Sequence, residues 1–300
     1  MEMLGSQRGP RLELWQEFDM IAGTSTGGLI ALMLGRLRMS VADCIQAYKN
    51  LSREIFVPSQ RNANFAGKSM DFLKARGRFR SEPLEECVKA MLRARDLSEE
   101  ELLMDHGADS PAVFVCAVEG INSGAVVIRS YKSEEFDDLY GKCRIWEAAR
   151  ATPAASTFFD PIQIGGRMYV DGALKHNNPI EKVDEESTAL ERVAPPGPDV
   201  TGDFKSLVDA LKKIVTETDD TSNAFRKRNR DMINADRLFR FNVFHGLADA
   251  GLAEHEAVNK AEAHTGTYLK RFDTARDVER CANALKETGQ RLGYIAGGGW

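Results

Sequence analysis

The sequence predicts a protein of the α/β class, in which helices pack on a layered β-sheet. Short apolar runs typical of buried strands alternate with longer stretches typical of helices over most of the 300 residues. The composition, 43% hydrophobic and 28% charged, is that of a globular chain. A chain of this length can form one large domain or two ordinary ones.

Hydrophobic periodicity and helix-boundary residues define the expected elements of the first half. The helix expected at 26–37 is apolar almost all round, as in a buried helix. Pro83 fits the first turn of one helix, and Pro153 ends another. In chain order, we expect a strand at 17–22, helices at 26–37, 40–52 and 83–95, a short helix opened by the capping-box pair Ser98 and Glu101, strands at 112–119 and 125–131, and a helix at 143–152.

The second half is more polar. We expect a strand at 167–173 that ends in a glycine turn, no strand at 183–203, a linker at 194–203, helical structure at 204–230, a strand at 238–244, and helices at 254–271 and 274–287. These elements predict the following division of the chain: a leader at 1–16, a domain at 17–290 with a core at 17–181 and a C-terminal helical part at 204–290, and a tail at 291–300.

Charge and cysteine content narrow the function classes. The net charge of −5 argues against non-specific binding to nucleic acid. The five cysteines are scattered, which favours reduced thiols in a cytoplasmic protein without a zinc site. The N-terminus has no apolar core of a signal peptide, and the longest apolar runs are about half the ~20 residues of a membrane span. We therefore expect contact with lipid only at a membrane surface.

The stretch "FDMIAGTSTGGLIALML" at 18–34 carries a G-x-S-x-G motif between a buried strand and a buried helix. A nucleophile elbow requires this context, because a serine in a strained strand-to-helix turn needs small neighbours, here Gly23 and Gly27. The helix N-terminus would place backbone N–H groups beside the Ser25 hydroxyl. The alternatives are a structural glycine turn and a phosphate-binding loop, although the lysine of a P-loop is absent.

A serine nucleophile needs a base. Asp171, in "YVDGALKHNNP", ends an expected buried strand, where partial desolvation suits a carboxylate that acts on a hydroxyl without an imidazole. An ordinary Asp-Gly turn is the alternative. A triad of Ser25, Asp171 and His245 also fits the chain order of α/β hydrolases.

Together, these motifs resemble the patatin-like phospholipase family. "GTSTGG" at 23–28 matches its elbow, "DGA" at 171–173 matches its D-G-A/G motif, "NNP" follows at 177–179, and "IWEAARATPAASTFFDP" at 145–161 resembles the segment before that motif. The resemblance extends over 17–180 and much of 204–290. It implies a three-layer α/β/α sandwich with a central, mostly parallel sheet, and a Ser–Asp dyad that hydrolyses acyl esters of lipids.

The resemblance also assigns roles by position. It implies that Ser25 is the nucleophile, that Asp171 is the base, and that the N–H of Thr26 is an oxyanion donor. The residues expected to support the elbow and the Asp-Gly turn are Gly23, Thr24, Gly27, Gly28, Gly172 and Ala173. The mechanism needs neither a cofactor nor a metal, because a serine and a carboxylate suffice.

Two departures from the family pattern bear on activity. Only 22 residues precede Gly23, so the glycine-rich D-G-G-G-x-R-G loop and its flanking strand and helix are expected to be missing, and "LGSQRG" at 4–9 is interpreted as a chance similarity. The family's S-x-G-T-G strand after "NNP" is also missing. The first hypothesis is a phospholipase A-type lipid acyl hydrolase. The alternatives are a catalytically impaired lipid-binding or regulatory module and a fragment of a larger protein.

Two basic clusters, "KARGRFR" at 74–80 and "FRKRNR" at 225–230, are interpreted as solvated surface, with attraction to anionic head groups as the alternative. The expected partners are therefore a lipid ester substrate and a membrane surface, without nucleic acid or metal.

Overall fold

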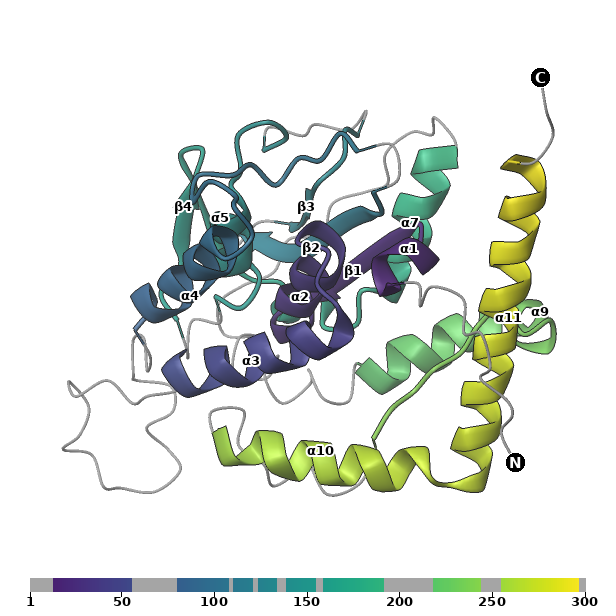
Figure 1. Cartoon of the computed structure of the whole chain (residues 1–300). Coiled ribbons are helices and arrows are strands. Elements are labelled where there is room, and N and C mark those ends of the chain that lie inside the picture. Colours follow the sequence, from purple (N-terminus) through teal and green to yellow (C-terminus); the bar gives the residue numbers. More distant parts are fainter. Residues whose placement is uncertain are drawn as a thin grey trace, which may run out of the picture.

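The computed structural model (Figure 1) describes residues 13–55, 80–107, 110–120, 124–133, 139–154, 159–191, 218–243 and 255–296. Residues 1–12 of the expected leader, the basic cluster at 74–80 except Arg80, the linker at 194–203 and His245 lie outside these residues.

The described strands form one mixed sheet, in which β2 pairs with β1, β3 and β5, and β4 pairs with β5. β1 runs parallel to β2 at the core of the sheet, whereas the pairs β2–β3, β2–β5 and β4–β5 are antiparallel. The strands are β1 (Met20–Thr24), β2 (Ala112–Glu119), β3 (Ala125–Arg129), β4 (Ile162–Ile164) and β5 (Arg167–Asp171).

β1 and β5 share one edge of β2 and meet there end to end. β3 occupies the other edge, since Cys116 pairs with both Thr24 and Val127. The last residue of β1 pairs with Cys116, and the last residue of β5, Asp171, pairs with Ala117. The carboxyl ends of two strands that run towards each other are therefore adjacent on β2.

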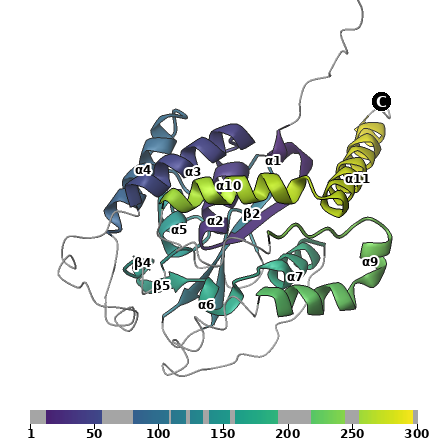
Figure 2. The ribbon, with the colours of Figure 1, turned by 90° about the horizontal axis from the view of Figure 1, so that it is seen from below.

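Helices cover both faces of the sheet, which confirms the α/β class and the layered arrangement. Alternate residues of β2 point to opposite faces, as a strand dictates. Val113 and Val115 belong to the main core, whereas Phe114 and Cys116 belong to a second cluster that includes Val183. Figure 2 shows α3 and α4 on one side of the strands and α7 on the other.

Helices of the main core are α2 (Thr26–Ala31), the π-helical turn η1 (Leu32–Arg36), α3 (Val41–Ile55), α4 (Glu82–Arg93) and α5 (Ile145–Ala151). The remaining described helices are α1 (Leu14–Glu17), α6 (Ala173–His176), α7 (Ile180–Glu191), an unlabelled helix at 218–228, α9 (Arg230–Asn234), α10 (His255–Leu269) and α11 (Phe272–Ala296). α10 lies beside α3 in Figures 1 and 2, and Lys49 of α3 pairs with Glu262 of α10 at 2.8 Å. Among the described helices, none combines the length and the apolar character needed to cross a bilayer.

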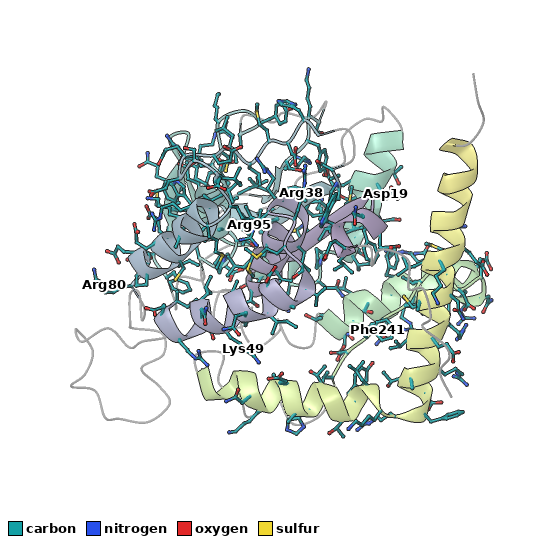
Figure 3. The ribbon with its side chains drawn as sticks, viewed as in Figure 1. Asp19, Arg38, Lys49, Arg80, Arg95 and Phe241 are labelled. Atoms are coloured by element: carbon teal, nitrogen blue, oxygen red, sulfur yellow. The ribbon has the colours of Figure 1, made fainter. Side chains whose placement is uncertain are left out.

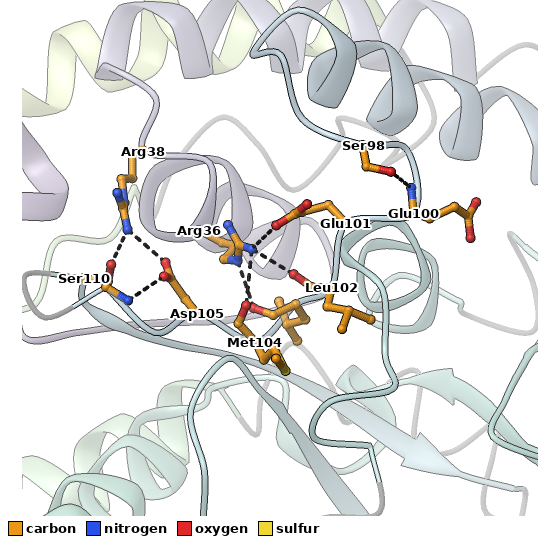
Figure 4. Close-up of polar contacts among 11 residues, drawn as sticks. Arg36, Arg38, Ser98, Glu100, Glu101, Leu102, Met104, Asp105 and Ser110 are labelled. Carbon is orange, nitrogen blue, oxygen red and sulfur yellow. Dashed lines mark hydrogen bonds and ion pairs between the residues drawn. The ribbon is translucent and has the colours of Figure 1, made fainter.

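The short helix expected at Ser98–Glu101 is wrong, because the chain forms only a turn there. The Glu101 N–H donates to the Ser98 carbonyl at 3.0 Å, but the Glu101 carbonyl accepts from the Ile145 N–H at the start of α5. The guanidinium of Arg36 binds the carbonyls of the next three residues, Leu102, Leu103 and Met104 (Figure 4). These long-range partners occupy the acceptors that a continuing helix would use.

The strand expected at 238–244 is also wrong, since its described part, 238–243, is irregular. The Asn242 N–H donates to the Tyr268 hydroxyl of α10 at 3.1 Å, in place of a strand partner. The elements that the pattern did not predict include α1, β4, α6 and α7. α7 is mostly polar, and a buried ion pair attaches it to the sheet: Arg129 of β3 makes a two-pronged contact with Glu186, whose carboxylate also accepts from the Tyr131 hydroxyl at 2.7 Å.

We predict that Glu186→Gln destabilises the fold by about 3–5 kcal/mol, because it removes the buried carboxylate that makes a two-pronged contact with the guanidinium of Arg129. Urea unfolding of the purified variant measures this change. Glu185→Gln is the matched control, since Glu185 is exposed and, among the described residues, pairs only with Lys182; its effect is expected to be within ~0.5 kcal/mol. Equal stability of the two variants would show that the buried pair does not hold α7.

Candidate active site

Ser25 occupies the turn between β1 and α2 and has a backbone that non-glycine residues rarely adopt. Its φ is 55° and its ψ is −127°. A side chain at this φ is strained, and the surrounding structure must stabilise it. The strain places the hydroxyl outside the strand and helix, where Ser25 Oγ donates to Asp171 Oδ2 at 2.9 Å.

Close packing explains the glycine before the serine. A Cβ at Gly23 would lie 2.1 Å from the carbonyl oxygen of Gly27, so only glycine fits where the strand end approaches the first helical turn. By contrast, a Cβ at Gly27 would meet no atom within 4 Å. The expectation that Gly27 is needed for the turn therefore has no steric basis here, and its missing side chain leaves open space beside Ser25.

Asp171 is the last residue of β5 and is 3% exposed. Its Oδ1 accepts the Ala173 N–H at 2.7 Å, within the turn formed by Gly172, while Oδ2 accepts the hydroxyl of Ser25. Burial raises the pKa of Asp171 from 3.8 to about 6, although both hydrogen bonds lower it. The carboxylate is thus a stronger base than an exposed aspartate, and it is still ionised at neutral pH.

The Thr152 side chain hydrogen-bonds to the backbone of the turn at Ser25. The sequence analysis did not predict this role. Its side chain is fully buried, and its Oγ1 accepts the Ser25 N–H and donates to the Cys116 carbonyl, each at 2.9 Å. Gly28 packs against the same side chain, since a Cβ there would lie 2.6 Å from Thr152 Oγ1. The sequence signal at this position is a threonine before Pro153, which by itself indicates only the end of a helix.

Two threonines flank the serine. Thr24 donates through Oγ1 to the carbonyl of His176 at 2.6 Å and so attaches β1 to α6. Thr26 begins α2, and its side chain hydrogen-bonds with Tyr48 of α3. The described residues supply no acceptor for the N–H groups of Thr26 and Gly27, as is normal in a first helical turn. Both are available to an oxyanion near Ser25.

Among the described residues, no histidine side chain hydrogen-bonds to Ser25 or Asp171. His245, the third member of the alternative triad, lies outside the described residues. Burial lowers the pKa of His176, whose main-chain carbonyl, rather than its imidazole, contacts the elbow. Among the residues with described structure, no three His, Cys, Asp or Glu side chains are grouped so that they could hold a metal ion.

The raised pKa of Asp171 predicts how the free energy of unfolding depends on pH. A folded-state pKa near 6 means that this group stabilises the fold below about pH 4 and that its contribution is lost as the pH rises through 6. Asp171→Asn removes this dependence. Relative to the original chain, we expect the variant to gain about 2 kcal/mol between about pH 4.5 and pH 7.5. Urea unfolding at both pH values tests this, and a pH-independent difference would contradict it.

Comparisons with known proteins point to one family. A family model described as patatin-like phospholipase matches residues 7–184. The chain is 28% identical over 281 residues to calcium-independent phospholipase A2-gamma of Rattus norvegicus, covering 86% of this chain and 35% of that protein. It is 26% identical over 223 residues to phospholipase A I of Arabidopsis thaliana, and the match covers 58% of this chain and 17% of that protein. A third relative, the probable inactive patatin-like protein 9 of Arabidopsis thaliana, is 26% identical over 187 residues. The match covers 57% of this chain and 44% of that protein.

The chain thus spans about a third of the rat relative. The family match covers more than half of the chain and includes both the elbow of Ser25 and the strand that ends at Asp171. The chain belongs to the patatin-like phospholipase family.

Proposed function

We propose that this chain is a lipid acyl hydrolase of the phospholipase A type, with Ser25 as nucleophile and Asp171 as its base. The observation that carries the proposal is the 2.9 Å hydrogen bond from Ser25 Oγ to the buried Asp171 carboxylate. The family and the phospholipase names of two relatives support a lipid ester as the substrate.

The first half of the reaction forms an acyl-enzyme. As Ser25 Oγ bonds to the ester carbonyl carbon, its proton passes to Asp171 Oδ2, and the carbonyl π electrons move to the oxygen. The N–H groups of Thr26 and Gly27 would donate to this oxyanion. Collapse of the tetrahedral intermediate then breaks the bond to the alcohol, which leaves with the proton from Asp171.

The second half releases the acid. Asp171 accepts a proton from water as the water oxygen attacks the acyl carbon. Collapse of the second intermediate breaks the bond to Ser25 Oγ, which takes the proton back. The products are a fatty acid and an alcohol, which is a lysophospholipid when the substrate is a diacyl phospholipid. One carboxylate therefore serves as base in each half of the reaction.

A second candidate function is a lipid-binding module with impaired catalysis. The observation that favours it is the name of one relative, probable inactive patatin-like protein 9. Such a module would bind lipid vesicles with unchanged affinity after substitution of Asp171.

Hydrolysis of p-nitrophenyl acyl esters separates the two functions. We predict that Ser25→Ala and Asp171→Asn each lower the rate roughly 10²–10⁴-fold, because one removes the nucleophile and the other its base. The original rate is expected to fall below about pH 6, as Asp171 becomes protonated. Asp184→Asn, an exposed carboxylate on α7, is the control and is expected to keep the full rate. If Ser25→Ala hydrolyses the esters as fast as the original chain, the dyad is rejected.

Thr152 provides a test of how the elbow is positioned. Thr152→Val removes the hydroxyl but keeps the shape, so the Ser25 N–H and the Cys116 carbonyl lose a buried partner. We predict at least about tenfold slower labelling of Ser25 by a fluorophosphonate probe, which corresponds to 1.4 kcal/mol or more.

Thr152→Ser retains the hydroxyl, and we expect it to restore most of the labelling rate. A loss of stability alone would lower the melting temperature of the valine variant without changing the labelling rate at lower temperature. That outcome would give Thr152 a purely structural role.

A further inference from the structure

A groove of about 780 Å³ lies at the end of the α2–η1 helix opposite to Ser25. Ten residues lie between Ser25 and Arg36, which places the two about 16 Å apart along the helix. The volume is within the range of small-molecule sites. Figure 3 labels Arg38 and Arg95, which both line it. The groove, called here the Arg95 groove, is lined by residues 36–38, Arg95, Leu97, 100–102 and 104–106.

Three acidic side chains line the groove, and each already has a cationic partner. Glu101 contacts Arg36 at 3.2 Å, and Asp105 contacts Arg38 at 3.0 Å (Figure 4). The third, Glu100, pairs with Arg144, which is not part of the lining. The acids of the groove are therefore neutralised by these pairs.

Two of the groove's arginines are fixed by these contacts. Arg36 also donates to three main-chain carbonyls, which leaves it few free donors. Arg38 stacks on the Trp15 ring, with its guanidinium carbon 5.4 Å from the ring centroid. Its side chain is 41% exposed, so part of its guanidinium still faces solvent.

Arg95 differs from these two arginines. Its side chain is half-buried, and its Nε donates to the Leu37 carbonyl at 3.3 Å. No carboxylate among the described residues pairs with it. The Nε contact orients the planar guanidinium, while the N–H groups of both terminal nitrogens remain available. A half-buried guanidinium with free paired donors is suited to a two-pronged contact with an oxyanion.

We propose that the Arg95 groove binds the phosphate group of a small organic phosphate. Arg95 contacts two phosphate oxygens, and the exposed part of Arg38 adds a second positive charge. The apolar side chains of Leu37, Leu97 and Leu102 contact the organic part of the ligand. The phosphate belongs either to a free phosphomonoester or to the phosphodiester head group of a lipid. This site is separate from Ser25 and does not depend on the proposed hydrolase activity.

Calorimetric titration of the full chain at low salt tests the proposal with three probes: inorganic phosphate, glycerol 3-phosphate and glycerophosphocholine. We expect at least one organic phosphate to bind, and Arg95→Gln to weaken its binding at least tenfold. Arg95→Lys keeps the charge but loses the planar fork, so we expect an intermediate affinity. Arg93→Gln is the matched control, because Arg93 precedes Arg95 by two residues, pairs with Glu99 and lies outside the lining. We expect it to change the affinity less than twofold.

The probes also distinguish the two sources. Tighter binding of glycerol 3-phosphate identifies a free phosphomonoester, and tighter binding of glycerophosphocholine identifies a lipid head group. Fluorescence of Trp15, which contacts Arg38, should change on binding and be unchanged in Trp15→Phe. The proposal is overturned if none of the probes binds at about 10 mM, or if Arg93→Gln and Arg95→Gln weaken binding equally. If Arg95→Gln does not fold, the comparison of Arg95→Lys with the control decides.

Discussion

β1 and β5 approach each other end to end along one edge of β2, at the adjacent residues Cys116 and Ala117. This meeting brings Ser25 to Asp171, although 146 positions separate them in the sequence. It also positions Thr152, because its hydroxyl links the Cys116 carbonyl to the Ser25 N–H. The geometry of the site therefore depends on the pairing of β1 and β5 with the same edge of β2.

The two faces of the sheet contribute differently to this arrangement. On one face, buried apolar side chains of α2 and its neighbours form the main core. On the other, α7 has few apolar residues and relies on the ion pair between Arg129 and Glu186. Because α7 follows β5 directly through α6, the same ion pair also restrains the segment after Asp171.

Local patterns in the sequence predicted the elements on which the candidate site rests. The apolar run before Gly23 and the apolar helix after it gave the strand and helix around Ser25, and the strand ending at Asp171 followed from its own short pattern. Each of these signals lies within about ten residues of the chain. Local periodicity is most informative for buried elements, since every side chain in them contributes to the pattern.

Features that depend on contacts between residues far apart in the sequence could not be predicted from local patterns. The turn after Ser98 forms because Arg36, some 65 positions away from Glu101, takes carbonyls that a helix would need. The role of Thr152 depends on a hydrogen bond across 127 positions. α7 lacked the apolar stripe that identifies an amphipathic helix. In each case, the deciding contact involves a polar group whose partner cannot be found in the neighbouring sequence.

The end-to-end junction also has a consequence for the order of events during synthesis. A ribosome releases the elbow long before β5, so the early chain holds a serine without its carboxylate. Contacts between such distant positions form late in folding, since the intervening loop must first be closed. The completed Ser25–Asp171 pair is accordingly a feature that forms only once both strands have paired with β2.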